Sequence, residues 1–177
     1  TQRGPSVSMS VNRSFSELTA LRSSDLIING QTVNLSLAKS DSTSPSGINS
    51  AGSAISKAAA INLISDSTGV NAVVGKTVMT GQSMAAGGVV SGTLVINGYT
   101  SPVINTINNN IRESRGVVVE AINRMTKDTG VIAINTNDDF KGVRLEAADG
   151  RNVEIGFNTT ATDQTFAARN RQSRKCS

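Results

Sequence analysis

The chain has 177 residues and a formal charge of +4, with no His, no Trp and a single Cys at position 176. These absences exclude a Ser-His-Asp triad, a His-based zinc site, an internal disulfide framework and a Cys-ligated iron–sulfur cluster. Residues 1–168 carry 13 basic and 13 acidic groups, so the excess positive charge lies in Arg169, Arg171, Arg174 and Lys175. A neutral body with few aromatic side chains does not favour a nucleic-acid partner, and no apolar run approaches the roughly 20 residues of a membrane span.

The first predicted elements lie between residues 26 and 75. Leu26–Ile28 is a β-prone run that stops at Asn29-Gly30, a strong signal for a tight hairpin turn, and the chain returns through Thr32, Val33 and Leu35. A helix follows, because Ala54, Ala58, Ile61 and Ile64 have helical spacing, with Ser50 or Ser53 as its N-cap. We expect a short strand at Val70–Val74, directly after Gly69.

The same order recurs between residues 94 and 134. Leu94–Ile96 is followed by Asn97-Gly98, which predicts a second hairpin. A helical stripe then contains Val118, Ala121, Ile122 and Met125, and Gly130 suits the left-handed position just past a helix end. Val117–Val119 favours a strand by propensity, but the sustained periodicity predicts a helix there. A strand at Val131–Ile134 is expected next.

A third hairpin is predicted further along. Val143, Leu145 and Ala147 alternate with polar residues, and Val153, Ile155 and Phe157 do the same. A three-residue loop at Ala148-Asp149-Gly150 would place the two apolar faces together, with Gly150 left-handed.

The two blocks form an internal repeat. Leu26-Ile27-Ile28-Asn29-Gly30 reappears as Leu94-Val95-Ile96-Asn97-Gly98, and an Ala-Ile-Asn ending at Asn62 reappears ending at Asn123. Each Ala-Ile-Asn is followed, at the same spacing, by Thr-Gly-Val-x-Ala. We therefore expect an α+β fold of two hairpin–helix–strand units with small antiparallel-rich sheets, each covered by one short helix. The predicted domains are residues 1–80, residues 81–160 and a basic tail or linker at 161–177.

This repeat resembles the Ile-Asn-Gly motif found in the outer domains of bacterial flagellins. The resemblance covers residues of about 24–157, and the segment from Leu145 to Val153 is similar to the hairpin that often follows the motif. It implies a structural role for the motif residues, which are Asn29, Gly30, Asn62, Gly69, Asn97, Gly98, Asn123, Gly130 and Gly150. It also implies an extracellular, surface-exposed part of a flagellar filament subunit, with antigenic and motility-related roles.

Long terminal helices, through which flagellin subunits contact one another, are not part of this sequence. The chain also begins at Thr1 without an initiator Met or a signal peptide. We therefore expect a fragment that contacts other flagellin subunits only through segments missing here, and that is monomeric when isolated. The alternatives are a filament-cap or hook-associated domain, or a carbohydrate-binding or adhesive module. The scarcity of aromatics argues against strong sugar stacking.

Two ligand motifs have simpler interpretations. Gly69 to Thr77 ends in Gly-Lys-Thr like a phosphate-binding loop, but five residues separate its glycines instead of four, and a strand is the better account. Asn135, Asn137, Asp139 and Glu146 match positions 1, 3, 5 and 12 of a calcium loop, but position 6 is Phe140 where Gly is needed. A polar loop before a hairpin is the better account there.

No cofactor, metal or enzymatic activity is therefore predicted. Cys176 lacks a His to activate it and is interpreted as a free thiol in a polar tail. Scattered carboxylates offer no paired acid and base, so a glycosidase site is not expected. The Ser/Thr-rich loop at Ser40–Ser46 is our candidate for O-glycosylation, with an unmodified loop as the alternative.

Overall fold

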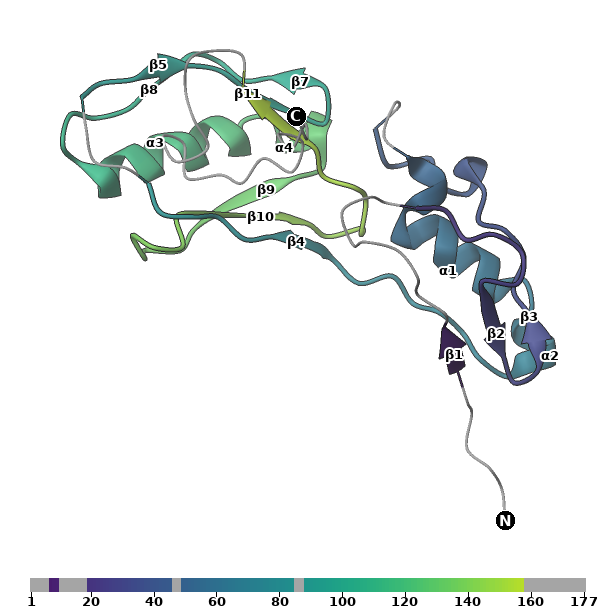
Figure 1. The fold of residues 1–177 in the computed structure, drawn as a ribbon. Helices are drawn as coiled ribbons and strands as arrows, with labels where there is room; N and C mark the ends of the chain where they lie inside the picture. Colours follow the sequence, from purple (N-terminus) through teal and green to yellow (C-terminus); the bar gives the residue numbers. More distant parts are fainter. Residues whose placement is uncertain (1–6, 10–18, 46–48, 85–87, 158–177) are drawn as a thin grey trace, which may run out of the picture. The chain divides into compact units, whose positions relative to one another are not determined.

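The protein has a mixed α+β fold of helices and small antiparallel sheets (Figure 1). The computed structural model describes residues 7–9, 19–45, 49–84 and 88–157. The chain divides into two compact units, a first unit of Thr1–Gly75 with Gly150–Asn152 and a second unit of Lys76–Asp149 with Val153–Ser177. Lys76 to Thr80, which the sequence pattern assigns to the first domain, thus belong to the second unit. The predicted tail at 161–177, with Cys176, lies outside the described residues.

The described elements follow in chain order. The first unit contains β1 (Val7–Met9), β2 (Leu26–Ile28), β3 (Gln31–Thr32), the 3₁₀ turns η1 (Ala38–Ser40) and η2 (Ser50–Gly52), α1 (Ala54–Asn62) and α2 (Ser65–Thr68). The second unit contains β4 (Thr77–Met79), β5 (Ser91–Gly92), β6 (Leu94–Ile96), β7 (Tyr99–Thr100), β8 (Ile104–Asn105), α3 (Ile111–Asn123), α4 (Thr126–Thr129), β9 (Ile132–Asn135), β10 (Val143–Ala147) and β11 (Ile155–Phe157).

The first unit is built on the predicted hairpin. β2 and β3 are antiparallel, and the turn residues Asn29 and Gly30 have φ values of 49° and 82°, which is the geometry of a hairpin turn that follows the strand twist. β1 pairs antiparallel with the other edge of β2. The small core contains Leu26, Ile28, Val33 and Ala60, and the partly buried Leu21, Ile61, Ile64 and Val70 pack against it.

Helix α1 confirms the predicted helix and selects one of its two candidate caps. The Ser53 hydroxyl accepts a hydrogen bond of 3.1 Å from the backbone N–H of Ser56, so Ser53 is the N-cap. The buried positions are Ser56, Ala58 and Ala60, whereas Ala54 is exposed. The predicted stripe was therefore wrong at its first residue, because the first turn lies at the edge of the small core.

The second unit contains three small sheets over a larger core. β6 and β7 form the second predicted hairpin, with Asn97 at φ 50° and Gly98 at φ 86°. β5 pairs with β8, and β10 lies between β4 and β9. Fourteen buried residues form one cluster, which is Met79, Met84, Leu94, Ile96, Ile104, Val118, Ile122, Met125, Val131, Ala133, Val143, Leu145, Ala147 and Ile155.

Helix α3 supplies one face of this core. Val118 and Ile122 are completely buried and Met125 lies just beyond the helix end, as the periodicity predicts. The β-branched run Val117–Val119 is helical, because one of its residues is buried and the two others pack against the core. At its start, Asn110 accepts a hydrogen bond of 3.1 Å from the N–H of Glu113 and acts as the N-cap.

The predicted third hairpin was wrong. β10 pairs with β4 and β9, with Leu145 opposite both Met79 and Ala133, and β11 pairs with β6, with Ile155 opposite Ile96. Gly150 does have a left-handed φ of 75°, but it belongs to a connection that leaves the sheet. Alternation identifies the buried face of a strand, whereas either of its two edges can take the partner.

The predicted strand at Val70–Val74 was also wrong. This segment pairs with no strand of the described part of the chain, and the next strand, β4, begins only at Thr77. Its exposure nevertheless alternates, with Asn71 and Val73 exposed and Ala72 and Val74 half-buried. The apolar pattern of this segment therefore predicted its alternating exposure correctly. It did not predict that the segment lacks a strand partner in the described part of the chain.

Candidate functional site

The turn asparagines of the repeat tie each hairpin to the end of a helix. The side-chain amide of Asn29 donates a 2.9 Å hydrogen bond to the carbonyl of Thr68, and that of Asn97 donates a 2.9 Å bond to the carbonyl of Thr129. Asn tolerates the positive φ of this turn position and also carries a donor that can reach the helix end. The repeated Asn therefore serves both the turn and the packing of the hairpin on the helix.

The helix asparagines form a second repeated contact, which we call the helix–strand clamp. Asn62 accepts a 2.7 Å hydrogen bond from the N–H of Ala72 and donates a 3.0 Å bond to its carbonyl. Asn123 binds Ala133 with the same two distances. A carboxamide offers one donor and one acceptor side by side, so it satisfies both backbone groups of one extended residue. The clamp thus fixes the chain that leaves each helix.

The repeated glycines end the short helices that precede the clamped segments. Gly69 and Gly130 have φ values of 68° and 70°, and their N–H groups bond to the carbonyls of Ser65 and Thr126 at 2.7 and 2.8 Å. This is a left-handed C-cap, which glycine adopts at little steric cost. All the repeated motif residues therefore support the backbone of their own unit.

Asn97 has an additional role in the second unit. Its N–H donates a 3.0 Å bond to the carbonyl of Glu154, and its side-chain oxygen accepts a 2.9 Å bond from the N–H of Glu154. These bonds hold the start of β11 beside β6. They explain why β11 joins the β6–β7 hairpin and not β10.

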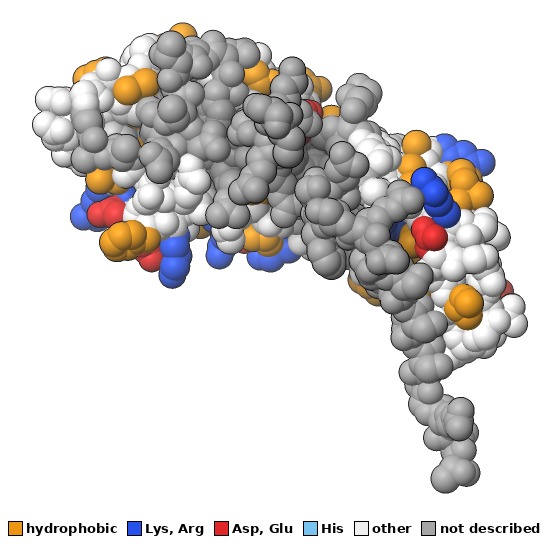
Figure 2. Space-filling view, viewed as in Figure 1, with side chains coloured by type: hydrophobic (Ala, Val, Ile, Leu, Met, Phe, Trp, Pro, Cys, Tyr) orange, Lys and Arg blue, Asp and Glu red, His pale blue; other side chains and the backbone are white. Residues whose placement is uncertain are grey.

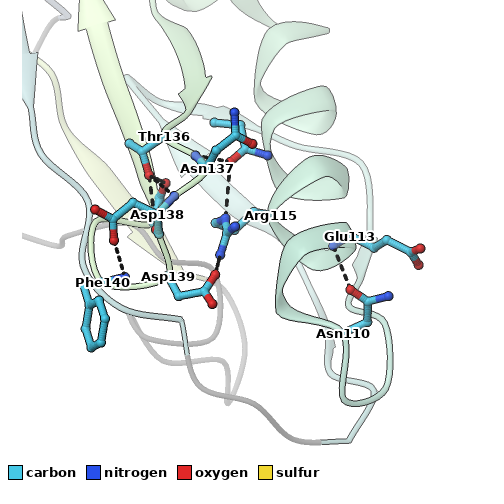
Figure 3. Close-up of polar contacts among 10 residues, drawn as sticks. Asn110, Glu113, Arg115, Thr136, Asn137, Asp138, Asp139 and Phe140 are labelled. Atoms are coloured by element: carbon cyan, nitrogen blue, oxygen red, sulfur yellow. Dashed lines mark hydrogen bonds and ion pairs between the residues drawn. The ribbon is translucent and has the colours of Figure 1, made fainter.

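Arg115 of α3 anchors the loop between β9 and β10 (Figure 3). Its side chain is only 2% exposed, its Nε donates a 3.2 Å bond to the side-chain oxygen of Asn135, and its guanidinium binds the carboxylate of Asp139. Our sequence interpretation overlooked Arg115. The available signal was its position at i, with Val118 at i+3 and Ile122 at i+7, which places a charge on the apolar stripe of the helix.

The anchored loop has its own internal hydrogen bonds. The Thr136 hydroxyl donates a 2.7 Å bond to the carbonyl of Gly142, and the Asp138 carboxylate accepts a 2.8 Å bond from the N–H of Phe140. That N–H, together with Lys141 at 3.3 Å, lowers the pKa of Asp138 below its ordinary value. At the tip, Phe140 is 86% exposed, and its ring points away from Arg115 (Figure 3).

The contacts of this loop leave no calcium site. Arg115 binds both Asn135 and Asp139, two residues of the calcium-loop pattern, so a guanidinium lies where that pattern would place an ion. The fourth residue of the calcium pattern, Glu146, binds Lys76 at 2.9 Å and Arg144 at 3.0 Å. The hydrogen bond from Lys76 lowers the pKa of Glu146. No cluster of three metal-ligating side chains occurs in the described ranges.

The phosphate-loop alternative also does not fit the geometry. Such a loop leads into a helix whose N-terminus binds the phosphates, but here Thr77 begins the strand β4. Its lysine, Lys76, is paired with the carboxylate of Glu146. This segment therefore belongs to the first unit as far as Gly75, and Lys76 leads directly into β4 of the second unit.

The buried carboxylate of Asp41 organises residues 40–45 of the predicted Ser/Thr-rich loop, and its last residue, Ser46, lies outside the described residues. One oxygen of Asp41 accepts hydrogen bonds from the N–H groups of Thr43 and Ser44 at 3.1 and 2.9 Å. Burial alone would raise the pKa of Asp41, but hydrogen bonds from Ser44, Ser53 and these backbone groups lower it to about 2. O-glycosylation of this loop stays a prediction.

The visible surface is mixed. On the face shown in Figure 2, hydrophobic side chains of the described residues form small separate groups among polar and charged atoms. Within the described ranges, no helix combines the length and the apolar character needed to cross a membrane.

In comparisons with known proteins, no protein-family model, curated protein or solved structure matches this chain significantly. The flagellin-like motif therefore supports a proposal about function and does not establish a family.

Proposed function

We propose that this chain is a structural domain displayed on the outside of a flagellin-like filament subunit, with no reaction of its own. The supporting observation is that the repeated residues have the same structural roles in both units. Asn29 and Asn97 bind equivalent carbonyls, and Asn62 and Asn123 clamp equivalent alanines at the same distances. A repeated motif whose residues all bind the backbone of their own unit is typical of a structural domain that displays a surface.

The test is the location of the domain on the intact cell. Antibodies raised against residues 19–157 should label filaments along their whole length in immunogold electron microscopy of the source bacterium. Label restricted to filament tips would indicate the cap-protein alternative, and label at the filament base would indicate a hook-associated protein. Signal confined to the cell interior would contradict all three. Cells from which this segment has been deleted in the chromosome are the matched control.

An adhesive role is a second candidate, favoured by Phe140. Phe140 is 86% exposed on an anchored loop and offers an apolar ring, and the same loop carries the carboxylate of Asp138, which can accept hydrogen bonds from sugar hydroxyls. Glycan-array binding that is lost in Phe140→Ala and retained in the neighbouring Lys141→Ala would support this candidate. An array without signal above background would remove it.

A further inference from the structure

The segment Val70–Val74 of the first unit is the counterpart of β9 in the second unit. Both follow a left-handed glycine, Gly69 or Gly130, and both are clamped at the equivalent alanine. β9 pairs along its length with β10. Val70–Val74 has no such partner among the described residues, and Figure 1 draws the chain between α2 and β4 as an extended thread without a strand arrow.

The clamp determines which backbone groups of these segments face outward. Ala133 directs its N–H and C=O toward Asn123, so in an antiparallel ladder the groups of Ile132 and Ile134 face β10, opposite Glu146 and Arg144. Ala72 binds Asn62 in the same way. The backbone groups of Asn71 and Val73 therefore point away from the clamp, and among the described residues they have no hydrogen-bond partner.

The apolar side chains at equivalent positions of the two helices also differ in burial, and the first unit is again the less covered one. In the second unit, Ile122 and Met125 are buried in one core with Val143 and Leu145 of β10. Their counterparts in the first unit, Ile61 and Ile64, are only half-buried. Next to the clamp, Leu63 is 75% exposed and Val73 is 91% exposed. The described part of the first unit thus lacks both the strand and the apolar cover that β10 provides in the second.

The sequence does not protect this edge. Between Asp66 and Lys76 there is no charged residue and no proline, which are the residues that native proteins use to keep exposed edges from pairing. An uncharged edge with free backbone groups is suited to adding a strand.

We propose that Val70–Val74 is a docking edge that binds an extended segment of a partner protein by strand addition. The second unit defines the chemistry of this occupant. It is an antiparallel segment with aliphatic residues at alternate positions, like Val143, Leu145 and Ala147, which cover the helix side. The residues between them, which correspond to Arg144 and Glu146, exchange backbone hydrogen bonds with Val73 and Asn71. This inference does not depend on the proposed function.

The test uses the whole chain and a peptide probe. A capped peptide with the sequence of residues 141–149 is titrated into the ¹⁵N-labelled chain, and we expect amide shifts centred on Asn71 and Val73. N-methylation of the peptide at the positions of Arg144 and Glu146 should weaken binding at least tenfold, because those N–H groups face the edge. N-methylation at the position of Leu145 should change the affinity less than threefold, because that N–H faces the opposite side.

Two variants at one exposed position provide the test from the protein side. Val73→Pro removes the outward N–H and should weaken peptide binding at least tenfold, whereas Val73→Thr keeps it and should bind like the original chain. Equal melting temperatures of the two variants would show that folding is unaffected. The proposal is overturned if millimolar peptide shifts no amide in this segment or shifts β9 instead. It is also overturned if the chain alone dimerises and Val73→Pro abolishes the dimer, because the occupant is then a second copy.

Discussion

At the residue scale, four asparagines connect elements that are distant in sequence. Asn29 and Asn97 reach helix ends 39 and 32 residues away, and Asn62 and Asn123 each bind both backbone groups of one alanine. A carboxamide is uncharged at all pH values and offers a donor and an acceptor, so it can satisfy backbone groups at little desolvation cost. The repeat is recognisable because each of these contacts needs Asn at one spacing.

The two clamps should differ in strength. Asn123→Ala should lower the free energy of unfolding of the second unit by about 2–3 kcal/mol, because it leaves the N–H and C=O of Ala133 unpaired at a part-buried site. Asn62→Ala should cost the first unit only about 1 kcal/mol, because water reaches that exposed clamp. Hydrogen exchange at the amides of Ala133 and Ala72 provides the measurement. Equal losses of protection would contradict the argument from burial.

Asp41 should make the first unit sensitive to acid. Its pKa is about 2 in the folded chain and ordinarily 3.8, so its contribution to stability is fully present above pH 3.8 and is lost as the pH falls toward 2. Asp41→Asn should remove up to about 2 kcal/mol at neutral pH and flatten the decline in stability between pH 4 and pH 2. Denaturant unfolding of the first unit at several pH values gives the comparison. An unchanged decline in the variant would assign the acid sensitivity to other carboxylates.

At the element scale, helix α3 combines an apolar stripe with one buried charge. Val118 and Ile122 face the core, and Arg115 on the same stripe binds Asn135 at the end of β9 and Asp139 in the middle of the β9–β10 loop. A buried guanidinium needs such partners, since leaving it unpaired is strongly unfavourable. The helix thus positions the β9–β10 loop through one polar contact.

Removing the exposed partner of Arg115 should therefore affect the whole loop. Asp139→Ala is expected to destabilise the second unit by about 2 kcal/mol, because the guanidinium stays buried with only Asn135. Phe140→Ala, one residue away and highly exposed, should cost less than about 0.5 kcal/mol. Chemical denaturation compares the two variants. A larger cost for Phe140→Ala would indicate that its ring packs on the protein.

Two glycines with similar positive φ values, Gly98 and Gly150, should respond differently to alanine. Gly98 has φ 86° and open space within 4 Å of where a Cβ would lie, so Gly98→Ala carries only the backbone penalty of about 1 kcal/mol. A Cβ at Gly150, with φ 75°, would lie 2.2 Å from Val74 Cγ1 and 2.7 Å from the carbonyl oxygen of Gly75. Gly150→Ala should therefore cost about 2–4 kcal/mol. Melting temperatures test whether Gly150→Ala is the more destabilising variant. Similar melting temperatures for both variants would mean that the backbone at Gly75 shifts at little energetic cost to accommodate the new Cβ.

At the scale of the whole molecule, the two units have separate cores of very different size. Four buried apolar residues form the core of the first unit, and fourteen form that of the second, within the described part of the chain. Because the hydrophobic contribution to stability grows with the buried apolar area, the second unit is expected to be the more stable.

Thermal unfolding should therefore occur in two steps. We expect calorimetry to show a smaller transition at lower temperature for the first unit and a larger one for the second. Asn62→Ala should shift only the lower transition, and Asn123→Ala only the upper one. A single transition that both variants shift equally would show that the two units unfold as one.

The sequence by itself determined the local geometry of this protein. Asn29-Gly30 and Asn97-Gly98 form the expected turns, Gly69, Gly130 and Gly150 are left-handed, and the helical stripe of α3 is buried, because each of these features depends on a few neighbouring residues. The tertiary structure alone decided which edges pair. β10 joins β4 and β9, β11 joins β6 through Asn97, and Val70–Val74 pairs with nothing described. Pairing depends on backbone groups that every residue shares, so the side-chain pattern of a strand identifies its buried face but not its neighbour.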